Sequence, residues 1–353
     1  MCHLAGYIGN KNGIPFIIES LRIQEPLIGA QATGLASIID NNIVMDKDIG
    51  PVKYFEEKFN LEKFSSSVAM GHTRYALKNL THTKTNTKEK AHPFWDSTNK
   101  FVTMHNGTII NYMDFVTPLE EMGYVFKSKS TIQDKITDQE KTDYCDSEIF
   151  SFILEEELKK TDNLKQAIKN SCKDIQGHFA FVTLHPDNKD EILIANWMQP
   201  VYVAFNNEEA FFSSFEVGLQ PIQDLMNWSF KPSHNSLITL SRGKITVEPL
   251  VDERKIPSNI PEADLVEQAV FDIVKKGINN PIKVFLELEA NPDKINMTKT
   301  EFETLCPKSG FTFTPMLFQS AKNLVEKGKL VRKLEYVNEG GIKDTPRYMY
   351  YPK

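Results

Sequence analysis

The sequence predicts a mixed α+β fold with many antiparallel strands over residues 1–250, followed by a small, mainly helical domain. The first observation is a series of short β-rich runs separated by turn residues, at 179–184, 192–195, 201–205 and 210–213. The second is the helical spacing of the apolar residues Ile149, Phe150, Ile153 and Leu154, with acidic residues on the opposite face. The third is the change to helical composition beyond residue 261.

The expected elements follow in order along the chain. Asn41 and Asn42 mark the tip of a hairpin between residues 32–40 and 43–45. Helices are expected at 111–122, 147–160 and 164–175, and the polar stretch 127–142 is expected to be a surface loop. Further on, Gly243 lies in the turn of a second hairpin, between 236–240 and 244–247.

The pattern predicts two domains joined by a linker. We expect one domain at 1–250, a proline-containing linker at 251–261 and a second domain at 262–353. The second domain would hold helices within 263–327 and then a hairpin formed by 329–337 and 347–351. Helices followed by a hairpin form the layout of a winged helix.

Composition excludes several classes of protein. The chain has 353 residues, 41% hydrophobic and 25% charged, which is typical of globular proteins. Its net charge of −6 argues against nonspecific nucleic-acid binding by the whole chain. We expect no membrane span and no secretory signal, because the apolar runs are short. The 4 cysteines form no CxxC pair, which argues against a zinc ribbon. Four cysteines in so long a chain do not make a disulfide scaffold, so a reducing cytoplasm is expected.

Cys2 is the first candidate for chemistry. If Met1 is removed, Cys2 carries a nucleophilic thiol and a free α-amine on one residue. An α-amine has a pKa close enough to neutrality to act as the base for the thiol. The alternative is that a cysteine at the second position is incidental.

Three further motifs offer groups that could recognise a substrate. Arg74, in residues 71–76, follows a strand-like run and presents a planar fork suited to a carboxylate, unless it forms a surface ion pair. Asn106 and Gly107 could form an oxyanion hole from a side-chain amide and a backbone N–H, or only an Asn-Gly turn. Asp146 could bind a substrate ammonium or cap the helix that it begins.

Taken together and in this order, the motifs resemble the class II glutamine amidotransferases, whose nucleophile is an N-terminal cysteine. Within that family the sequence is most similar to the glutaminase domain of glucosamine-6-phosphate synthase. The resemblance covers about residues 2–250 and rests on short segments in the family's order, at 2–9, 21–36, 71–76, 91–93, 105–107, 146–148 and 175–181.

The resemblance implies an Ntn-hydrolase fold, a four-layer αββα sandwich of two antiparallel sheets between helical layers. It implies that Cys2 attacks the side-chain amide of glutamine to form a thioester, releasing ammonia and then glutamate. Asn106 and Gly107 would hold the oxyanion. The resemblance further implies that Arg74 binds the α-carboxylate and Asp146 the α-ammonium, with Tyr75 at the substrate site.

The sequence departs from this family in two respects. Leu77 and Lys78 replace the Thr-His that the sugar-type enzymes carry after the arginine motif. Only about ninety residues follow the resembling region, and they contain no Gly-rich phosphate loop. We therefore expect a separate synthase subunit to accept the ammonia. We expect no cofactor and no metal, because the spacing of His72, His82 and His92 is not a ligand pattern.

Two readings of the function remain open. The first is a glutamine-hydrolysing subunit that supplies nitrogen to a sugar phosphate, a nucleotide or a modified base. The second is a retired amidotransferase that senses glutamine and regulates through the winged helix. From Ala321 to Lys353 there are eight Lys and Arg against four Asp and Glu. DNA binding by this region is therefore an alternative, but protein docking or homo-oligomer formation is favoured.

Overall fold

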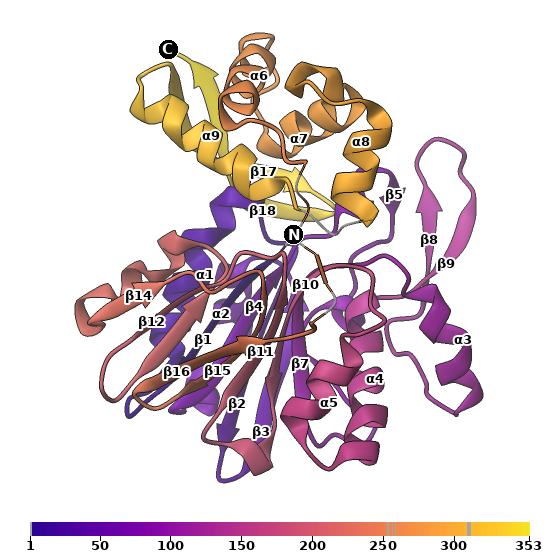
Figure 1. The fold of residues 1–353 in the computed structure, drawn as a ribbon, viewed down its shortest axis with the longest axis vertical. Helices are drawn as coiled ribbons and strands as arrows, with labels where there is room; N and C mark the ends of the chain where they lie inside the picture. Colours follow the sequence, from indigo (N-terminus) through magenta and orange to yellow (C-terminus); the bar gives the residue numbers. More distant parts are fainter. Residues whose placement is uncertain (1, 253, 256, 258, 309–311) are drawn as a thin grey trace.

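The computed structural model describes residues 2–353 except 253, 256, 258 and 309–311, and it leaves out the side chains of 307 and 308. Two large β-sheets with their helices form one body, and the C-terminal helices lie against it (Figure 1). Every ladder between the named strands is antiparallel. The predicted mixed fold with antiparallel strands is therefore confirmed.

The first sheet has seven strands and contains the N-terminal strand at its interior. Across the sheet the order is β14 (Trp228–Phe230), β12 (Tyr202–Phe205), β13 (Ala210–Ser213), β1 (His3–Ile8), β4 (Val68–Arg74), β2 (Ala32–Ile39) and β3 (Asn42–Ile49). Asp40 and Asn41 adopt positive φ in the β2–β3 turn, which matches the hairpin predicted there.

The second sheet has six strands and contains the His105–Asn106–Gly107 motif. Its order is β16 (Lys244–Pro249), β15 (Asn235–Ser241), β11 (Ile192–Trp197), β10 (Gly177–Leu184), β7 (Val102–Ile109) and β6 (Phe94–Trp95). All six residues of the central strand β11 are buried, as expected for a strand that is covered on both faces.

Side chains alternate between two cores along the strands. In β1, Leu4 and Ile8 belong to the cluster between the two sheets, together with Val182 of β10. Tyr7 points the other way and packs with Ile17 of helix α1. This alternation follows from the two-residue period of a strand, and it allows the sheets to stack while helices cover their outer faces.

The helices of the first body divide between the two sheets. They are α1 (Ile14–Ile28), α2 (Val52–Lys58), α3 (Met113–Glu121), α4 (Asp146–Thr161) and α5 (Leu164–Ser171). Helices α1 and α2 pack on the seven-stranded sheet. Helices α4 and α5 pack on the six-stranded sheet, where Phe150 stacks on Phe181 with ring centroids 3.6 Å apart. The helices predicted at 111–122, 147–160 and 164–175 are thus present.

The stretch 127–142 differs from the expected loop. It contains β8 (Ser130–Asp134) and β9 (Glu140–Asp143), which form a small sheet with β5 (His82–Thr83) and project from the body (Figure 1). The polar composition misled the prediction, because a projecting hairpin buries few side chains and so shows little apolar alternation. Ile132 is an exception that is fully buried at its base.

The C-terminal residues form helices and a long hairpin that shares a core with the first body. The elements are α6 (Ala263–Lys275), α7 (Pro281–Ala290), α8 (Lys299–Glu303), α9 (Thr314–Glu326), β17 (Leu330–Glu339) and β18 (Ile342–Pro352). Their apolar cluster includes Ile28, Tyr75 and Phe215 of the first body. Residues 253, 256 and 258 of the predicted linker lie outside the described residues.

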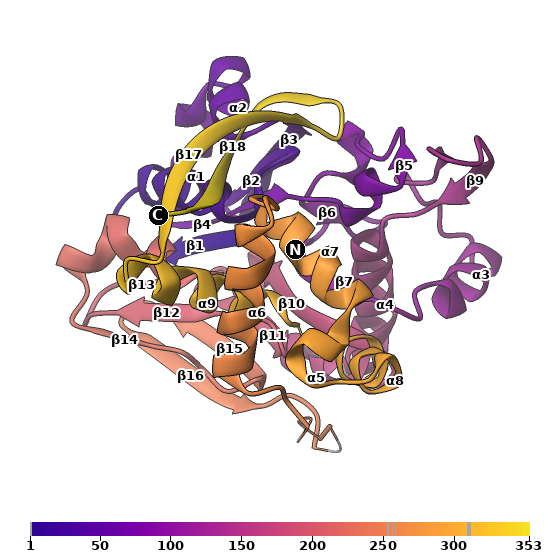
Figure 2. The ribbon, with the colours of Figure 1, turned by 90° about the horizontal axis from the view of Figure 1, so that it is seen from above.

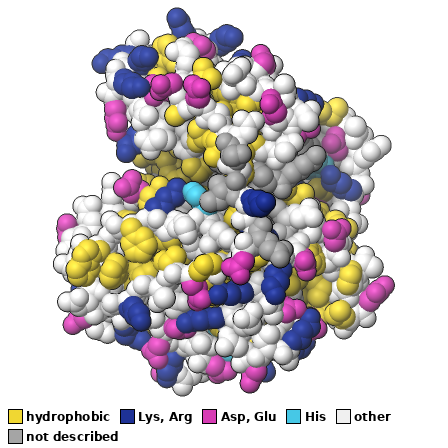
Figure 3. Space-filling model, in the orientation of Figure 1, with side chains coloured by type: hydrophobic (Ala, Val, Ile, Leu, Met, Phe, Trp, Pro, Cys, Tyr) yellow, Lys and Arg dark blue, Asp and Glu magenta, His cyan; other side chains and the backbone are white. Residues whose placement is uncertain are grey.

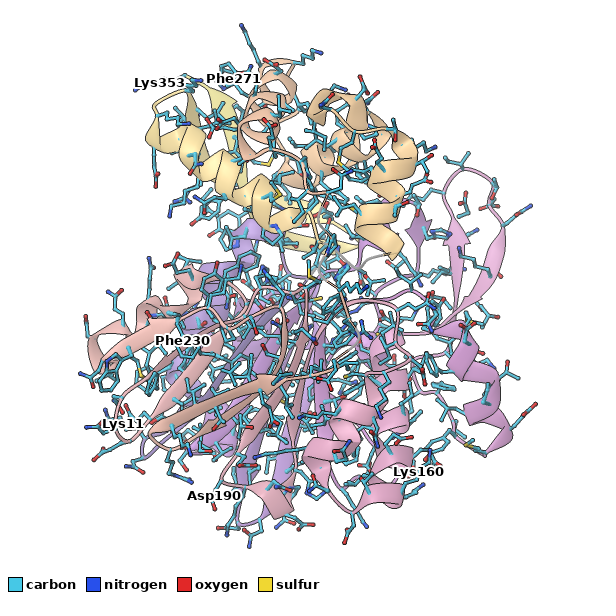
Figure 4. The ribbon with its side chains drawn as sticks, viewed as in Figure 1. Lys11, Lys160, Asp190, Phe230, Phe271 and Lys353 are labelled. Carbon is cyan, nitrogen blue, oxygen red and sulfur yellow. The ribbon has the colours of Figure 1, made fainter. Side chains whose placement is uncertain are left out.

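Two surface features complete the description. Among the described residues, no helix has the length and apolar character needed to cross a bilayer. Exposed apolar side chains gather over β12 and β14 (Figure 3), where Trp228 and Phe230 are 52% and 40% exposed. Figure 4 labels Phe230 on this edge of the seven-stranded sheet.

Candidate active site

Cys2 lies at the meeting point of the two sheets and the C-terminal region. The pairing of β1 with β4 sets His3 opposite Thr73, which places Cys2 opposite Arg74 at the end of both strands. Only 7% of the Cys2 surface is exposed. The candidate nucleophile is therefore buried at the start of an interior strand of the seven-stranded sheet, and Met1 lies outside the described residues.

Asn106 joins Cys2 from the second sheet. The Cys2 backbone nitrogen donates a hydrogen bond of 2.8 Å to Oδ1 of Asn106, which is fully buried near the end of β7. The Asn106 Nδ2 donates to Ser214 Oγ at 3.3 Å, and Ser214 Oγ also accepts the Leu4 N–H at 2.9 Å. These bonds fix the orientation of the Asn106 amide relative to the nitrogen of Cys2.

Tyr75 supplies a backbone donor to the sulfur. The Tyr75 N–H points at Cys2 Sγ over 3.4 Å, and the thiol faces the Tyr75 carbonyl oxygen at 3.9 Å. A backbone N–H directed at a sulfur stabilises its anionic form. Burial raises the pKa of the Tyr75 phenol to about 12, so this side chain stays neutral.

Gly107 needs to be a glycine for steric reasons. Its φ is +140°, and a Cβ atom at this position would lie 2.0 Å from the His178 carbonyl oxygen. A side chain would therefore collide with the neighbouring strand β10. The Asn-Gly pair is part of β7 rather than the ordinary turn that was its alternative reading.

Arg74 is held by the side chain of Asn86 and by the backbone of Gln31. Its Nη1 donates to Asn86 Oδ1 at 2.8 Å, and its carbonyl oxygen accepts the Gln31 N–H at 2.7 Å. Gln31 Oε1 in turn accepts the N–H of Ala76 at 3.0 Å. Arg74 is half-buried and makes no ion pair among the described residues, so its charge is available to an anion.

Asp146 does not cap the helix that it begins. Helix α4 has Cys145 as its N-cap residue, without a side-chain capping bond. Asp146 Oδ2 instead accepts the Ile109 N–H at 2.9 Å, and Ser147 Oγ donates to Asp146 Oδ1 at 3.3 Å. The carboxylate therefore ties the start of α4 to the end of β7, two residues after Gly107.

A buried ion cluster beside the site was not anticipated from the sequence. Asp143 accepts hydrogen bonds from Lys78 on one oxygen and from the fully buried Lys90 on the other. Burial favours the neutral acid, but the two lysines outweigh it and hold the pKa of Asp143 below its usual value. Lys78, one of the two residues that stand in place of Thr-His, also interacts electrostatically with Asp146 and is therefore held at the edge of the site.

Histidines line the buried side of the site. A His72 ring N–H donates to the His105 carbonyl oxygen at 3.0 Å, and the His72 and His92 ring centroids lie 3.9 Å apart. Burial lowers the pKa of His105 to about 4 and those of His72 and His92 well below 6.5. Within the described part of the chain, no group of three or more His, Cys, Asp or Glu could hold a metal ion.

The structure thus brings five of the six candidate residues around one point. Asn106 and the backbone of Tyr75 contact Cys2 directly, and Gly107 follows Asn106 on β7. The strand register places Arg74 opposite Cys2. Asp146 is linked to the group only through Ile109. Residues that the sequence did not single out are Gln31, Asn86, Asp143, Lys90 and Ser214. No local pattern in the sequence marks these residues, because their contacts join segments that are distant along the chain.

Comparison with known proteins supports this reading of the site. Residues 78–220 match the family described as "Glutamine amidotransferase domain". The chain is similar to the "Glutamine--fructose-6-phosphate aminotransferase [isomerizing]" of Pyrococcus horikoshii, with 29% identity over 214 residues, 61% of this chain and 32% of that protein. The same enzyme of Thermococcus kodakarensis is 26% identical over 273 residues, covering 77% and 40% of the two chains. The chain therefore spans about a third of the length of these relatives.

Solved structures agree in fold. The glutamine phosphoribosylpyrophosphate amidotransferase of B. subtilis, complexed with ADP and GMP, superimposes with a TM-score of 0.55 and 16% identity, covering 77% of this chain and 58% of that one. A structure titled as the allosteric regulatory enzyme of purine biosynthesis gives a TM-score of 0.57 at 16% identity, with 77% and 57% coverage. The family match over residues 78–220, the relatives and the fold agree: this part of the chain is similar to class II glutamine amidotransferase domains, and Cys2 is the candidate nucleophile.

Proposed function

We propose that this chain hydrolyses L-glutamine to glutamate and ammonia, with Cys2 as the nucleophile. The observation that carries the proposal is the pair of contacts at Cys2. Its backbone nitrogen lies 2.8 Å from Asn106 Oδ1, and its sulfur accepts the Tyr75 N–H at 3.4 Å. Once Met1 is removed, this nitrogen is the α-amine, held beside the sulfur that it must deprotonate.

The reaction follows from these positions. Cys2 Sγ attacks the amide carbon of glutamine while the α-amine takes the thiol proton, and the carbonyl oxygen becomes an oxyanion. Asn106 Nδ2 and the Gly107 N–H stabilise that oxyanion. The C–N bond breaks as the α-ammonium returns the proton to the departing nitrogen, which leaves as ammonia. Water then attacks the γ-glutamyl thioester, the thiol is regained and glutamate leaves.

Charged groups at the two ends of the site would select the amino acid. Arg74, free of ion pairs among the described residues, binds the α-carboxylate in this proposal, and Asp146 binds the α-ammonium. Tyr75 follows Arg74 in the chain and contacts the nucleophile through its backbone N–H. The three cations Arg74, Lys78 and Lys90 outnumber Asp143 and Asp146, which favours a ligand that carries a carboxylate.

We further propose that residues 1–250 form the four-layer αββα sandwich of Ntn-hydrolases, joined through 251–261 to a winged-helix-like domain at 262–353. The two stacked sheets with helices on their outer faces support the first part, and the helices followed by a long hairpin support the second. The three buried cysteines and the half-buried Cys306 are all free, in keeping with the reducing cytoplasm that we propose as its location.

A separate synthase subunit is the proposed acceptor of the ammonia. The chain covers about a third of its relatives' length, and residues 251–353 carry no Gly-rich phosphate loop. On α9, Lys322 faces Glu326, while Asn323 and Lys327 bond to Glu267. Acidic groups thus accompany the cations of this helix, which favours docking to protein, either the synthase or a second copy, over DNA.

One contact favours a second candidate function, that of a glutamine sensor. The C-terminal hairpin contacts Tyr75, whose OH donates to Glu339 Oε1 at 2.8 Å. A glutamine sensor without activity could transmit ligand binding through that contact.

The experiment compares glutamate release and glutamine binding in the purified chain and its Cys2→Ala variant. We expect the natural chain to release glutamate and the variant to bind glutamine without releasing it. Glutamine binding without glutamate release by both proteins would contradict hydrolysis and establish the sensor. Equal release by both proteins would contradict the role of Cys2.

A further inference from the structure

The C-terminal hairpin reaches across the first body to the mouth of the candidate active site. It lies between the C-terminal helices and the sheets and passes over α1 (Figures 1 and 2). Asp344 accepts the hydroxyl hydrogen of Tyr54 at 3.2 Å, and Thr345 Oγ1 donates to the Ala30 carbonyl oxygen at 3.4 Å. Both contacts are made by adjacent residues of β18 close to the turn, so they fix the position of the hairpin tip.

The tip itself holds the loop that adjoins Arg74. The Gly340 carbonyl oxygen accepts a hydrogen bond of 2.8 Å from Asn86 Nδ2, while Asn86 Oδ1 accepts from Arg74. Gly340 has φ of +62°, and a Cβ there would lie 2.7 Å from Gln31 Nε2. A larger residue would be strained at this φ and would displace the Gln31 and Asn86 amides.

Arg347 and Glu339 hold Tyr75 from the same hairpin. Arg347 is fully buried, forms an ion pair with Glu339 and lies over the Tyr75 ring at 5.0 Å. The other carboxylate oxygen of Glu339 accepts the Tyr75 hydroxyl. A Cβ on Gly29 would lie 2.6 Å from the Arg347 guanidinium, so a glycine at the end of α1 makes room for it.

Burial of a guanidinium destabilises the folded state unless its partners compensate for the lost hydration. Arg347 meets one carboxylate, and its Nε and Nη1 have no hydrogen-bond partner among the described residues. An apolar side chain would therefore satisfy packing alone at lower cost. The arrangement is better explained by the geometry that it imposes on Tyr75, whose N–H is aimed at Cys2 Sγ.

We propose that Glu339 and Arg347 are positioning residues of the glutaminase reaction. They hold Tyr75 so that its N–H faces the Cys2 sulfur, and the hairpin tip holds Asn86 so that Arg74 faces the substrate carboxylate. Full activity then requires the hairpin to be seated on the amidotransferase domain. The inference rests on the proposed glutaminase function.

The test is a double-variant cycle between Tyr75→Phe and Glu339→Ala in the full chain, measured by glutamate release. Both single changes remove the Tyr75–Glu339 hydrogen bond, and Glu339→Ala also removes the carboxylate that pairs with Arg347. Tyr75→Phe should therefore lower kcat about tenfold, Glu339→Ala at least as much, and the double variant should lose little more than Glu339→Ala alone. Glu339→Gln keeps an acceptor for the Tyr75 hydroxyl and should recover part of the loss. Thermal unfolding of each variant would show whether the fold is retained.

Two further variants separate positioning from general damage. Arg332→Gln is the matched control, because Arg332 is exposed and lies over Tyr348 within the hairpin, so its kinetics should equal those of the natural chain. Asn86→Ala acts through Arg74 and should raise KM more than it lowers kcat.

Several outcomes would overturn the inference. Single variants with natural kcat would do so, as would a double variant whose loss equals the product of the single losses. A gain in kcat would also contradict it, because the hairpin would then be a brake. A natural chain that releases no glutamate would instead refute the proposed function, and the positioning role would fall with it.

Discussion

At the scale of single residues, the account depends on how Asn106 is oriented. Its Oδ1 accepts from the Cys2 nitrogen and its Nδ2 donates to Ser214, so the two ends of the amide have different partners. The Oδ1 end fixes the α-amine that acts as the base, and the Nδ2 end is the donor that we assign to the oxyanion. Aspartate would place a second acceptor where the donor is required.

Asn106→Ala should therefore lower kcat by about 10²–10³-fold, the usual effect of losing one oxyanion donor. KM should change little, because the bond strengthens only as the oxyanion forms. Steady-state glutamate release measures both constants. A variant with undiminished kcat would show that the oxyanion lies elsewhere.

Arg74→Ala should act on binding instead. Loss of a charge-assisted contact weakens glutamine binding by about 1.5–3 kcal/mol, and isothermal titration in the Cys2→Ala background measures this without turnover. Arg22→Ala is the control, because Arg22 is 45% exposed and pairs with Glu19 and Glu56 on the surface. Equal affinity in the two variants would contradict the role of Arg74.

At the scale of elements, β9 ends in the buried cluster beside the site. Asp143, the last residue of β9, joins Lys78 to Lys90 and so ties β9 to the two short 3-10 helices that hold these lysines. Asp143 directly follows the stretch 127–142 that was expected to be a loop.

Asp143→Ala should lower the free energy of unfolding by about 3–5 kcal/mol, because it leaves the fully buried Lys90 without its carboxylate. Glu140→Ala on the same strand is the control. Its partner Lys84 is 56% exposed, and we expect a loss of less than about 1 kcal/mol. Urea unfolding compares the two, and equal losses would show that the buried pair does not stabilise the fold.

Local pattern explains which elements the sequence predicted. The α4 helix and the hairpin at Asn41 were predicted within a few residues, because apolar spacing and turn residues act over short distances. Asn86, Glu339 and Arg347 were not singled out. Their significance arises only when segments more than 250 residues apart pack together, and no local pattern encodes that contact. The roles of Cys2 and Arg74 stay predictions, although their motifs were recognisable.

At the scale of the whole molecule, buried neutral histidines make stability depend on pH. Burial lowers the pKa of His3 and His178 to about 3 and that of His105 to about 4. In the unfolded chain these groups titrate near 6.5, so below that pH only the unfolded state takes up protons. Their contribution is therefore present above pH 6.5 and is lost as the pH falls toward 4.

Lowering the pH from 7 to 5 should reduce the free energy of unfolding by about 2 kcal/mol for each such histidine. Glu25 has the opposite effect on the free energy of unfolding. Burial raises its pKa to about 8, so the folded state takes up this proton before the unfolded state as the pH falls. This one carboxyl offsets the loss from only about one histidine. Urea unfolding at the two pH values measures the change. Stability that is equal or greater at pH 5 would contradict the buried neutral state.

The central claim is that the processed N-terminus is both nucleophile and base. Mass spectrometry of the intact protein after reaction with a glutamine-like electrophile tests it most directly. We predict a chain that has lost Met1 and carries one adduct, located on Cys2 by peptide mapping, with glutamine protecting against the label. A chain that retains Met1, or an adduct on Cys145, Cys172 or Cys306 in place of Cys2, would contradict the account.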